Sequence, residues 1–286
     1  MTDGRNILCV GRLYCDVIFT DLPRMPTPGT EVFSRGVGLH AGGGATITAG
    51  HLAALGHKAF LAAFLPPAPF RDLIEHELRE LQVDMRFCQE ADPSIDPQLT
   101  VALVQSDERA FVTHRAGPAV PNLTRADLDV LNPSHIHIGE AATLIDNPDL
   151  ITISKSLGAS LSLDCSWDDD LNPGMISHLL PEIDVFLPNE AEIRLLREQG
   201  LDNPLARLTV VKMGRQGARA ISTEAEVFSP AIPAKVVDTT GAGDAFNAAF
   251  LSAWLRDRSI EDCLAAGNAK GAEAVAFRGG MGGLST

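Results

Sequence analysis

Aromatic side chains and positive charges are both scarce in this 286-residue sequence. Phenylalanine, tryptophan and tyrosine make up 5% of it, with a single tyrosine, and 23 lysines and arginines stand against 37 aspartates and glutamates. The net charge of −14 argues against a surface that binds nucleic acid or an anionic membrane. An anionic ligand must therefore be held by local backbone amides, a few cations and a metal ion.

Paired cysteines and long apolar runs are also missing. The five cysteines are scattered, without a Cys-x-x-Cys pair, which predicts reduced and mostly structural thiols. No stretch approaches the 18 or so apolar residues of a membrane span. The opening Met-Thr-Asp-Gly-Arg-Asn does not resemble a signal peptide. We therefore expect a cytoplasmic protein with no membrane partner.

What is present suits one large α/β domain with a small appendage, since 45% of the residues are hydrophobic. Short apolar runs alternate with helical patterns, and this alternation predicts a parallel βαβ sheet. The runs that we assign to the main strands are residues 6–11, 135–140, 160–164, 185–187 and 208–213.

A long excursion follows the first of these strands. Strands are predicted at residues 15–19 and 31–35, on either side of a proline-rich loop at residues 22–29. Such a strand–loop–strand excursion predicts a flap. A helix is expected to open at residues 41–46, where a run of three glycines allows a polar ligand to approach.

The segment at residues 236–246 carries most of the functional information. Two valines favour the end of a strand, and after Gly241-Ala242-Gly243 a core-facing helix is predicted to start near Gly243. Free N–H groups at a helix start bind anions. Asp244 is then suited to accept a proton from a hydroxyl beside that anion. The plainer interpretation is a tight turn and an acid that complements the helix dipole.

The longer string Asp-Thr-Thr-Gly-Ala-Gly-Asp-Ala-Phe at residues 238–246 resembles the signature of the ribokinase / phosphofructokinase-B family of carbohydrate kinases. The resemblance implies a three-layer α/β/α sandwich with a mostly parallel sheet and a small β lid. It implies that ATP is the phosphoryl donor and that Asp244 is the base. The backbone amides of Gly241, Ala242 and Gly243 would form the anion hole. It also allows a monovalent cation, K⁺, beside Asp238 and Thr240.

In the same resemblance, residues 12–38 and 99–116 form the lid, and residues 1–11, 39–98 and 117–286 form the core. Asp16, Gly42 and Gly43 match the family's sugar site. Glu140 is a further candidate for holding a substrate hydroxyl, because it ends a predicted parallel strand. The family's usual residues are replaced at three places in this half, namely Gly44, Ile47 and Pro66-Pro67.

The second half supplies the nucleotide motifs of the resemblance. The segment that begins at Asn189 matches Asn-x-x-Glu, whose Glu192 would hold Mg²⁺ through water, although acids in a first helical turn are common. The remaining positions that would lie along the nucleotide are Lys212, Gly214, Gly217 and Asn268. Exposed lid strands need covering, and a homodimer formed through the lid would cover them.

Three alternatives accompany this interpretation. The alternating His135 and His137 suggest a metal, but partnered strand histidines are favoured because no third ligand has a useful spacing. A non-catalytic sugar- or nucleotide-binding regulator on the same fold is a second function. A kinase for a nucleoside or a vitamin-precursor alcohol is a third. The main prediction is an ATP-dependent kinase for a sugar or sugar-like small molecule.

Overall fold

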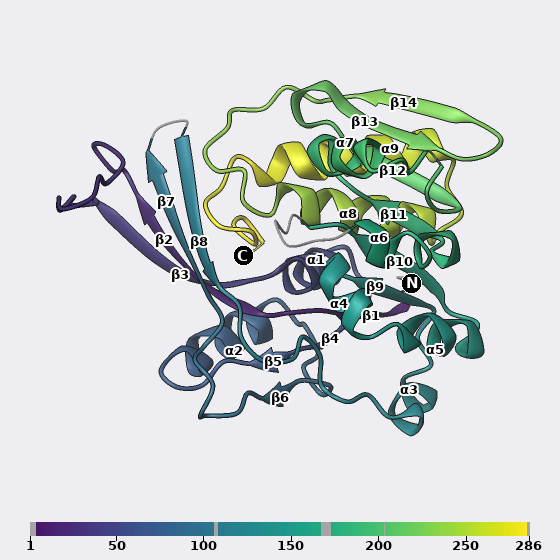
Figure 1. Ribbon diagram of the computed structural model, residues 1–286, viewed down its shortest axis with the longest axis horizontal. Helices are drawn as coiled ribbons and strands as arrows, with labels where there is room; N and C mark the ends of the chain where they lie inside the picture. The colour runs from purple at the N-terminus through teal and green to yellow at the C-terminus, as the bar shows by residue number, and fades with distance from the viewer. Residues whose placement is uncertain (1–3, 106–107, 167–172, 203, 285–286) are drawn as a thin grey trace.

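Eight strands form the central sheet of the computed structural model, which describes residues 4–105, 108–166, 173–202 and 204–284 (Figure 1). Their order is β14-β13-β12-β11-β10-β9-β1-β4, parallel from β12 to β4, with an antiparallel hairpin at the β14 edge. The bounds are β1 Asn6–Val10, β4 Lys58–Ala62, β9 His135–Ile138, β10 Ser160–Asp164, β11 Val185–Leu187, β12 Leu208–Lys212, β13 Gly217–Ile221 and β14 Glu226–Pro230.

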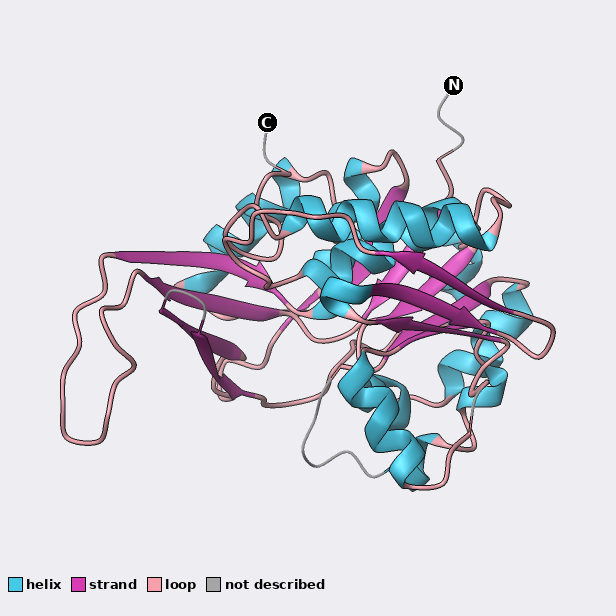
Figure 2. Ribbon diagram, turned by 90° about the horizontal axis from the view of Figure 1, so that it is seen from above, coloured by secondary structure: helices cyan, strands magenta, loops and turns pink. Residues whose placement is uncertain are grey.

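Helices cover both faces of this sheet, as the view in Figure 2 shows. Strands β1, β9, β10 and β11 are therefore buried along almost their whole length, as expected for parallel strands. One face packs on α3 Arg125–Leu131, α4 Ala141–Asp146, α5 Asp149–Leu157, α6 Pro173–Ile176 and α7 Glu190–Glu198. The other packs on α1 Gly44–Ala54, α2 Phe70–Glu80, α8 Ala242–Trp254 and α9 Ile260–Ala274. The predicted three-layer architecture is confirmed.

A second sheet of four strands, which we call the small sheet, projects from one side of the layers (Figure 1). Its order is β3-β2-β7-β8, with β2 and β7 parallel. The bounds are β2 Tyr14–Thr20, β3 Gly36–Gly42, β7 Leu99–Gln105 and β8 Glu108–His114. Short elements complete the described chain: β5 Phe64–Leu65, β6 Gln89–Glu90 and the 3₁₀ turns η1 Leu180–Glu182 and η2 Gly214–Gln216.

Two strand predictions were wrong. Residues 31–35 lie in a loop, and the strand begins at Gly36 because β2 ends opposite it, at Thr20. Glycine is needed there, since a Cβ on Gly36 would lie 2.5 Å from Thr20 Oγ1. Residues 236–237 are not in a strand either. The backbone N–H groups of Val237 and Asp238 instead donate to Val275 O, just after α9.

The first turn of α1 rests directly on the end of β9. A Cβ on Gly139 would lie 2.2 Å from Ala45 N, and a Cβ on Gly44 would lie 2.6 Å from Gly139 O. Only glycine permits this backbone contact. None of the helices in the described parts of the chain is long and apolar enough to span a bilayer.

We expect Gly139→Ala to lower the free energy of unfolding by about 1–3 kcal/mol, the usual range for overpacking, because backbone atoms cannot move aside cheaply. Urea denaturation measures the change. Gly271→Ala in α9 is the control, since its nearest neighbour would be 3.3 Å away. An equal loss in both variants would contradict the steric argument.

Candidate active site

The carboxyl ends of the parallel strands meet at one edge of the central sheet, where ligands bind in open α/β sheets. Gly11 follows β1, Gly139 follows β9, Asp164 ends β10, Asn189 closely follows β11 and Lys212 ends β12. Two polar residues that the sequence singled out, Asn189 and Lys212, therefore converge there with Asp164.

The Gly-Ala-Gly turn forms the N-terminus of α8 at this edge. Gly241 is the N-cap residue with φ 72°, and a Cβ there would lie 2.4 Å from Gly280 Cα. The helix ladder begins with Ala245 N donating to Gly241 O at 2.8 Å. Gly243 needs no positive φ, but its missing Cβ leaves the approach to the first helical amides open. The predicted helix start is confirmed.

Asp244 lies in the first turn of α8 and is half-buried. A Cβ on Gly44 would be 3.1 Å from its Oδ1, so the carboxylate lies against the start of α1. Burial, followed by the negative charge of Asp164, raises the pKa of Asp244 to about 8; Lys212 opposes this shift and Asp16 adds to it. A carboxylate in this state is a stronger base than an ordinary aspartate.

Asp16 reaches the same turn from the small sheet. A Cβ on Gly42 would lie 2.2 Å from Asp16 Oδ1, and one on Gly43 would lie 2.3 Å from Arg12 O. Burial raises the pKa of Asp16 to about 7, and the side chain of Thr100 limits the rise. The structure thus brings Asp16, Gly42 and Gly43 together with Asp244.

Glu140 is restrained by a residue that the sequence analysis missed. Its Oε1 accepts a hydrogen bond from Thr143 Oγ1 at 2.8 Å and lies 3.3 Å from Arg12 Nε. Arg12 is 6% exposed and also donates to Gln98 Oε1 at 2.9 Å and to Gly117 O at 2.8 Å. This arginine therefore ties the end of β1 to the chain on both sides of the small sheet.

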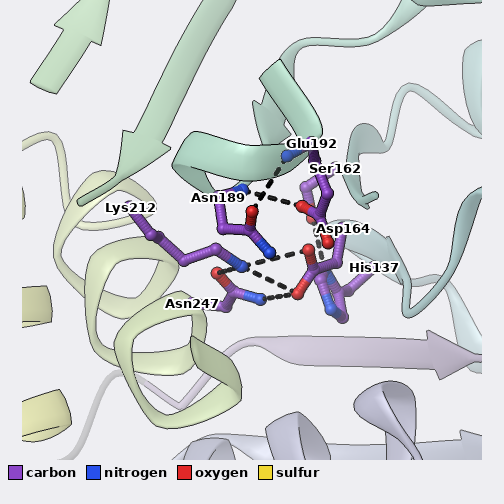
Figure 3. A network of polar contacts seen from close by, with 7 residues as sticks. All are labelled: His137, Ser162, Asp164, Asn189, Glu192, Lys212 and Asn247. Atoms are coloured by element: carbon purple, nitrogen blue, oxygen red, sulfur yellow. Dashed lines mark hydrogen bonds and ion pairs between the residues drawn. The ribbon is translucent and has the colours of Figure 1, made fainter. Parts of the chain in front are cut away.

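A closed polar network joins Lys212, Asp164 and Asn247 (Figure 3). The Lys212 ammonium donates to both oxygens of Asp164, at 3.0 and 2.9 Å, and to Asn247 Oδ1 at 3.2 Å. Asn247 Nδ2 donates in turn to Asp164 Oδ2 at 2.6 Å. Lys212 therefore contacts one protein carboxylate, that of Asp164, beside the position predicted for the nucleotide's phosphates.

Asn189 and Glu192 form a capping box at the start of α7, next to this network (Figure 3). Asn189 Oδ1 accepts from Ala191 N and Glu192 N, and Glu192 Oε2 accepts from Asn189 N at 2.7 Å. The structural role that the sequence also allowed is thus present.

The other predicted nucleotide positions lie in the last third of the chain. Gly214 opens η2 with φ 54° and no atom where a Cβ would be, whereas a Cβ on Gly217 would strike Ser229 O at 2.1 Å. Asn268 Nδ2 donates to Ser229 O and Pro230 O, which fastens α9 to β14. Contacts of these three residues with a nucleotide stay a prediction.

Asp238 is buried below the Gly-Ala-Gly turn. Its Oδ1 accepts from Thr240 N and Thr240 Oγ1, at 2.9 and 2.8 Å, and its Oδ2 accepts from Gly279 N at 2.9 Å. Arg109 of β8 lies 3.4 Å from Oδ1. A guanidinium thus already faces this carboxylate, and Asp238 with Thr240 fits a K⁺ site poorly.

The two strand histidines are partnered, as predicted. His135 Nε2 and His137 Nδ1 both lie 2.8 Å from Ser162 Oγ, and His135 Nδ1 lies 2.7 Å from Ser160 Oγ. Burial lowers the pKa of each ring to about 3, so both are neutral. Their role is to fill a buried polar stripe between β9 and β10.

The three unusual positions of the first half have local explanations. Gly44 is required by its contact with Gly139, and Ile47 packs on Gly280, where a Cβ would be 2.4 Å away. Pro66 and Pro67 line a separate cavity of about 370 Å³ beside the small sheet.

Five polar residues of the site were not predicted: Arg12, His40, Arg109, Asp164 and Asn247. Their signals were weak, because four of them lie inside or beside strands where charges are usually solvated. Asp164 was the easiest of them to predict, since it ends a buried strand at the edge where ligands bind.

Comparison with known proteins decides the family. A family model for pfkB family carbohydrate kinases matches residues 5–286. The chain belongs to the pfkB family of carbohydrate kinases. It is therefore a phosphotransferase that uses ATP to phosphorylate an alcohol group of a sugar.

This pfkB kinase is 26% identical to a ribokinase of Bacillus subtilis, over 99% of this chain and 97% of the relative. An uncharacterized sugar kinase of Archaeoglobus fulgidus is 36% identical over 118 residues, which are 39% of this chain and 47% of the relative. The structure of Arabidopsis thaliana ribokinase with ribose and ATP superposes with a TM-score of 0.80 at 22% identity, covering 97% and 95% of the two chains. The predicted ribokinase-like fold is confirmed.

We expect Asp16→Asn to raise the melting temperature at pH 8, by about 2 °C or more, and to leave it nearly unchanged at pH 4. The folded-state pKa of about 7 exceeds the unfolded value of about 3.9. Ionisation of Asp16 therefore destabilises the fold as pH rises between these values, and the loss persists above pH 7. Asparagine does not ionise, so the variant does not lose this stability as the pH rises.

Thermal unfolding at the two pH values measures the effect. Asp129→Asn on the exposed face of α3 is the control, with the same small change at both. A lower melting temperature for Asp16→Asn at pH 8 would contradict the buried, destabilising carboxylate.

Proposed function

We propose that this kinase phosphorylates a sugar or sugar-like alcohol bound between the Gly42–Gly43 turn and Asp16, with Asp244 as the base. The observation that carries the proposal is that Asp16, from the small sheet, and Asp244, from the first turn of α8, approach the same glycine turn. A hydroxyl held by one carboxylate then lies next to the other, at the mouth of α8.

In the proposed reaction, the substrate hydroxyl oxygen bonds to the γ-phosphorus of ATP while the bond from that phosphorus to the β,γ-bridging oxygen breaks. The hydroxyl proton passes to Asp244, and ADP leaves. The backbone amides of Gly241, Ala242 and Gly243 stabilise the negative charge of the transferring group. Glu140, held by Arg12, binds a second hydroxyl of the substrate.

The proposed path of the nucleotide runs along the carboxyl edge of β11 and β12. It is marked by Asn189, Lys212, Gly214, Gly217 and Asn268. The described residues contain no cluster of three or more His, Cys, Asp or Glu side chains able to hold a metal. This fits Mg²⁺ carried by the phosphates and held through water, as Mg²⁺ prefers. One oxygen of Glu192 accepts a hydrogen bond from Asn189 N. Glu192 would hold that water and so keep the positive charge of Mg²⁺ beside the phosphates.

An ADP-release screen with Mg-ATP over sugars, sugar acids, polyols and nucleosides tests the proposal and identifies the acceptor. With that acceptor, Asp244→Asn should lower kcat by at least about 10²-fold, the scale of a positioned base, with an unchanged circular dichroism spectrum. Asp129→Asn is the control and should keep its kcat. A variant that keeps most of its activity would remove Asp244 from this role. No acceptor-dependent ADP would favour the sugar- or nucleotide-binding regulator instead.

We propose further that the small sheet is the lid, made of residues 12–38 and 99–116. Cross-strand register puts His40, Asp16, Thr100 and Thr113 on one face. Arg109 lies on that face as well and reaches Asp238 in the core. This face therefore looks toward the site, and a lid over it would exclude water from the phosphoryl group.

The opposite face of the small sheet is apolar. Away from its base it presents Val17, Phe19, Val37, Leu39, Val101, Leu103 and Val112. Val37 is 65% exposed and Val112 is 67% exposed. In so acidic a chain, an exposed apolar sheet face is best covered by a second copy of itself. We infer a homodimer formed through this face.

Light scattering on the purified protein should give twice the chain mass, and Val112→Asp should shift it to one chain mass, because an unpaired carboxylate would be buried in the interface. Val130→Asp is the matched control: Val130 is 84% exposed on α3, far from the apolar face, and should leave the dimer intact. A monomeric wild type, or a Val112→Asp protein that stays dimeric, would exclude this interface.

A further inference from the structure

One ammonium group lies at the start of α8, between the carboxylate that it binds and the helix that carries Asp244. Lys212 Nζ lies within 3.0 Å of both oxygens of Asp164 (Figure 3). A Cβ on Gly243, the residue before Asp244, would lie 3.5 Å from the same Nζ. The side chains of Lys212 and Asp164 are 13% and 9% exposed. Water therefore screens these charges little, and each acts strongly on its neighbours.

Asn247 fixes the direction of the ammonium. It lies one helical turn after Gly243 on α8, accepts from Lys212 Nζ at 3.2 Å and donates to Asp164 at 2.6 Å. Strands β10 and β12 are joined through this amide to the helix that carries Asp244. If the lysine head turned away, Asp164 would keep only the hydrogen bond from Asn247, and Asn247 Oδ1 would lose the Lys212 donor.

We propose that Lys212, held by Asp164 and Asn247, is a positioning residue for phosphoryl transfer: it supplies the fixed positive charge that favours the ionised form of Asp244 beside the anion hole. The proposal rests on the proposed function, because it assigns a role to Lys212 only through the base Asp244.

The charged groups that act on Asp244 come from three elements. Asp164 of β10 and Asp16 of β2 raise its pKa, and Lys212 of β12 lowers it. The acid Glu192 of α7 acts on Lys212 itself and helps to keep it protonated, together with Asp164. Two carboxylates, Asp164 and Asp16, and one ammonium thus act on Asp244. Loss of the Asp164 charge should lower the pKa of Asp244, whereas loss of the Lys212 charge should raise it.

These opposite effects on the pKa of Asp244 provide the test. An ion pair with a purely structural role would not shift that pKa in opposite directions in the two variants. Lys212→Gln removes the positive charge but keeps a donor for Asp164, so the titration midpoint of Asp244 should rise by about one pH unit or more. Asp164→Asn removes the negative neighbour and leaves the ammonium in place, so the midpoint should fall by a similar amount.

The measurement is a ¹³C NMR titration of protein labelled at the aspartate carboxyl carbon, with the Asp244 resonance identified by its loss in Asp244→Asn. The wild-type midpoint should lie near pH 8. Lys155→Gln, at an exposed lysine of α5, is the matched control and should leave the midpoint unchanged. If one of the two variants fails to fold, the other still decides, because its midpoint must move in its own stated direction.

Midpoints that move apart in the stated directions support the role of Lys212. Midpoints that stay in place, or move together, overturn it, even if both variants lose activity. The two proposals fail separately. An active Asp244→Asn variant rejects the base, whereas an inactive one with unmoved midpoints rejects only the assignment of Lys212.

Discussion

The confinement of negative charge at one edge of the sheet is the constraint on which this site depends. Asp16, Asp164 and Asp244 meet there, in a chain with few positive charges to spare. Each carboxylate must then either be paired with a positive charge or have a raised pKa, because its ionisation beside other negative charges costs free energy. The fold gives one a full ammonium partner and leaves the other two with raised pKa values, which suits them to bind and deprotonate a neutral hydroxyl. A bound nucleotide adds more negative charge, so further positive partners are needed to complete the balance.

Glycines make this crowding sterically feasible. Gly42 leaves room for the carboxylate of Asp16, Gly44 and Gly139 let α1 rest on β9, and Gly241 turns into α8 against the C-terminal segment. At each place a Cβ would strike a backbone atom or a charged side chain. The same contacts explain why position 44 carries no side chain.

Much of the fold and part of the site could be predicted from the sequence. Periodicity located the main strands, and the Gly-Ala-Gly-Asp string located the start of α8, because both signals are local. Residues 31–35 and 236–237 have strand-like composition but found no neighbouring strand, and pairing is a non-local property. Arg12, Asp164 and Asn247 escaped prediction for the same reason: each acquires its function from partners more than 30 residues away.

The segment after α9 links the two halves of the molecule. Arg278 binds Asp21 at the end of β2, Gly279 N binds Asp238, and Gly280 supports both Gly241 and His51. Three consecutive residues therefore join the small sheet, the buried Asp238 and the Gly-Ala-Gly turn, so a displacement of this short segment would reach all three at once.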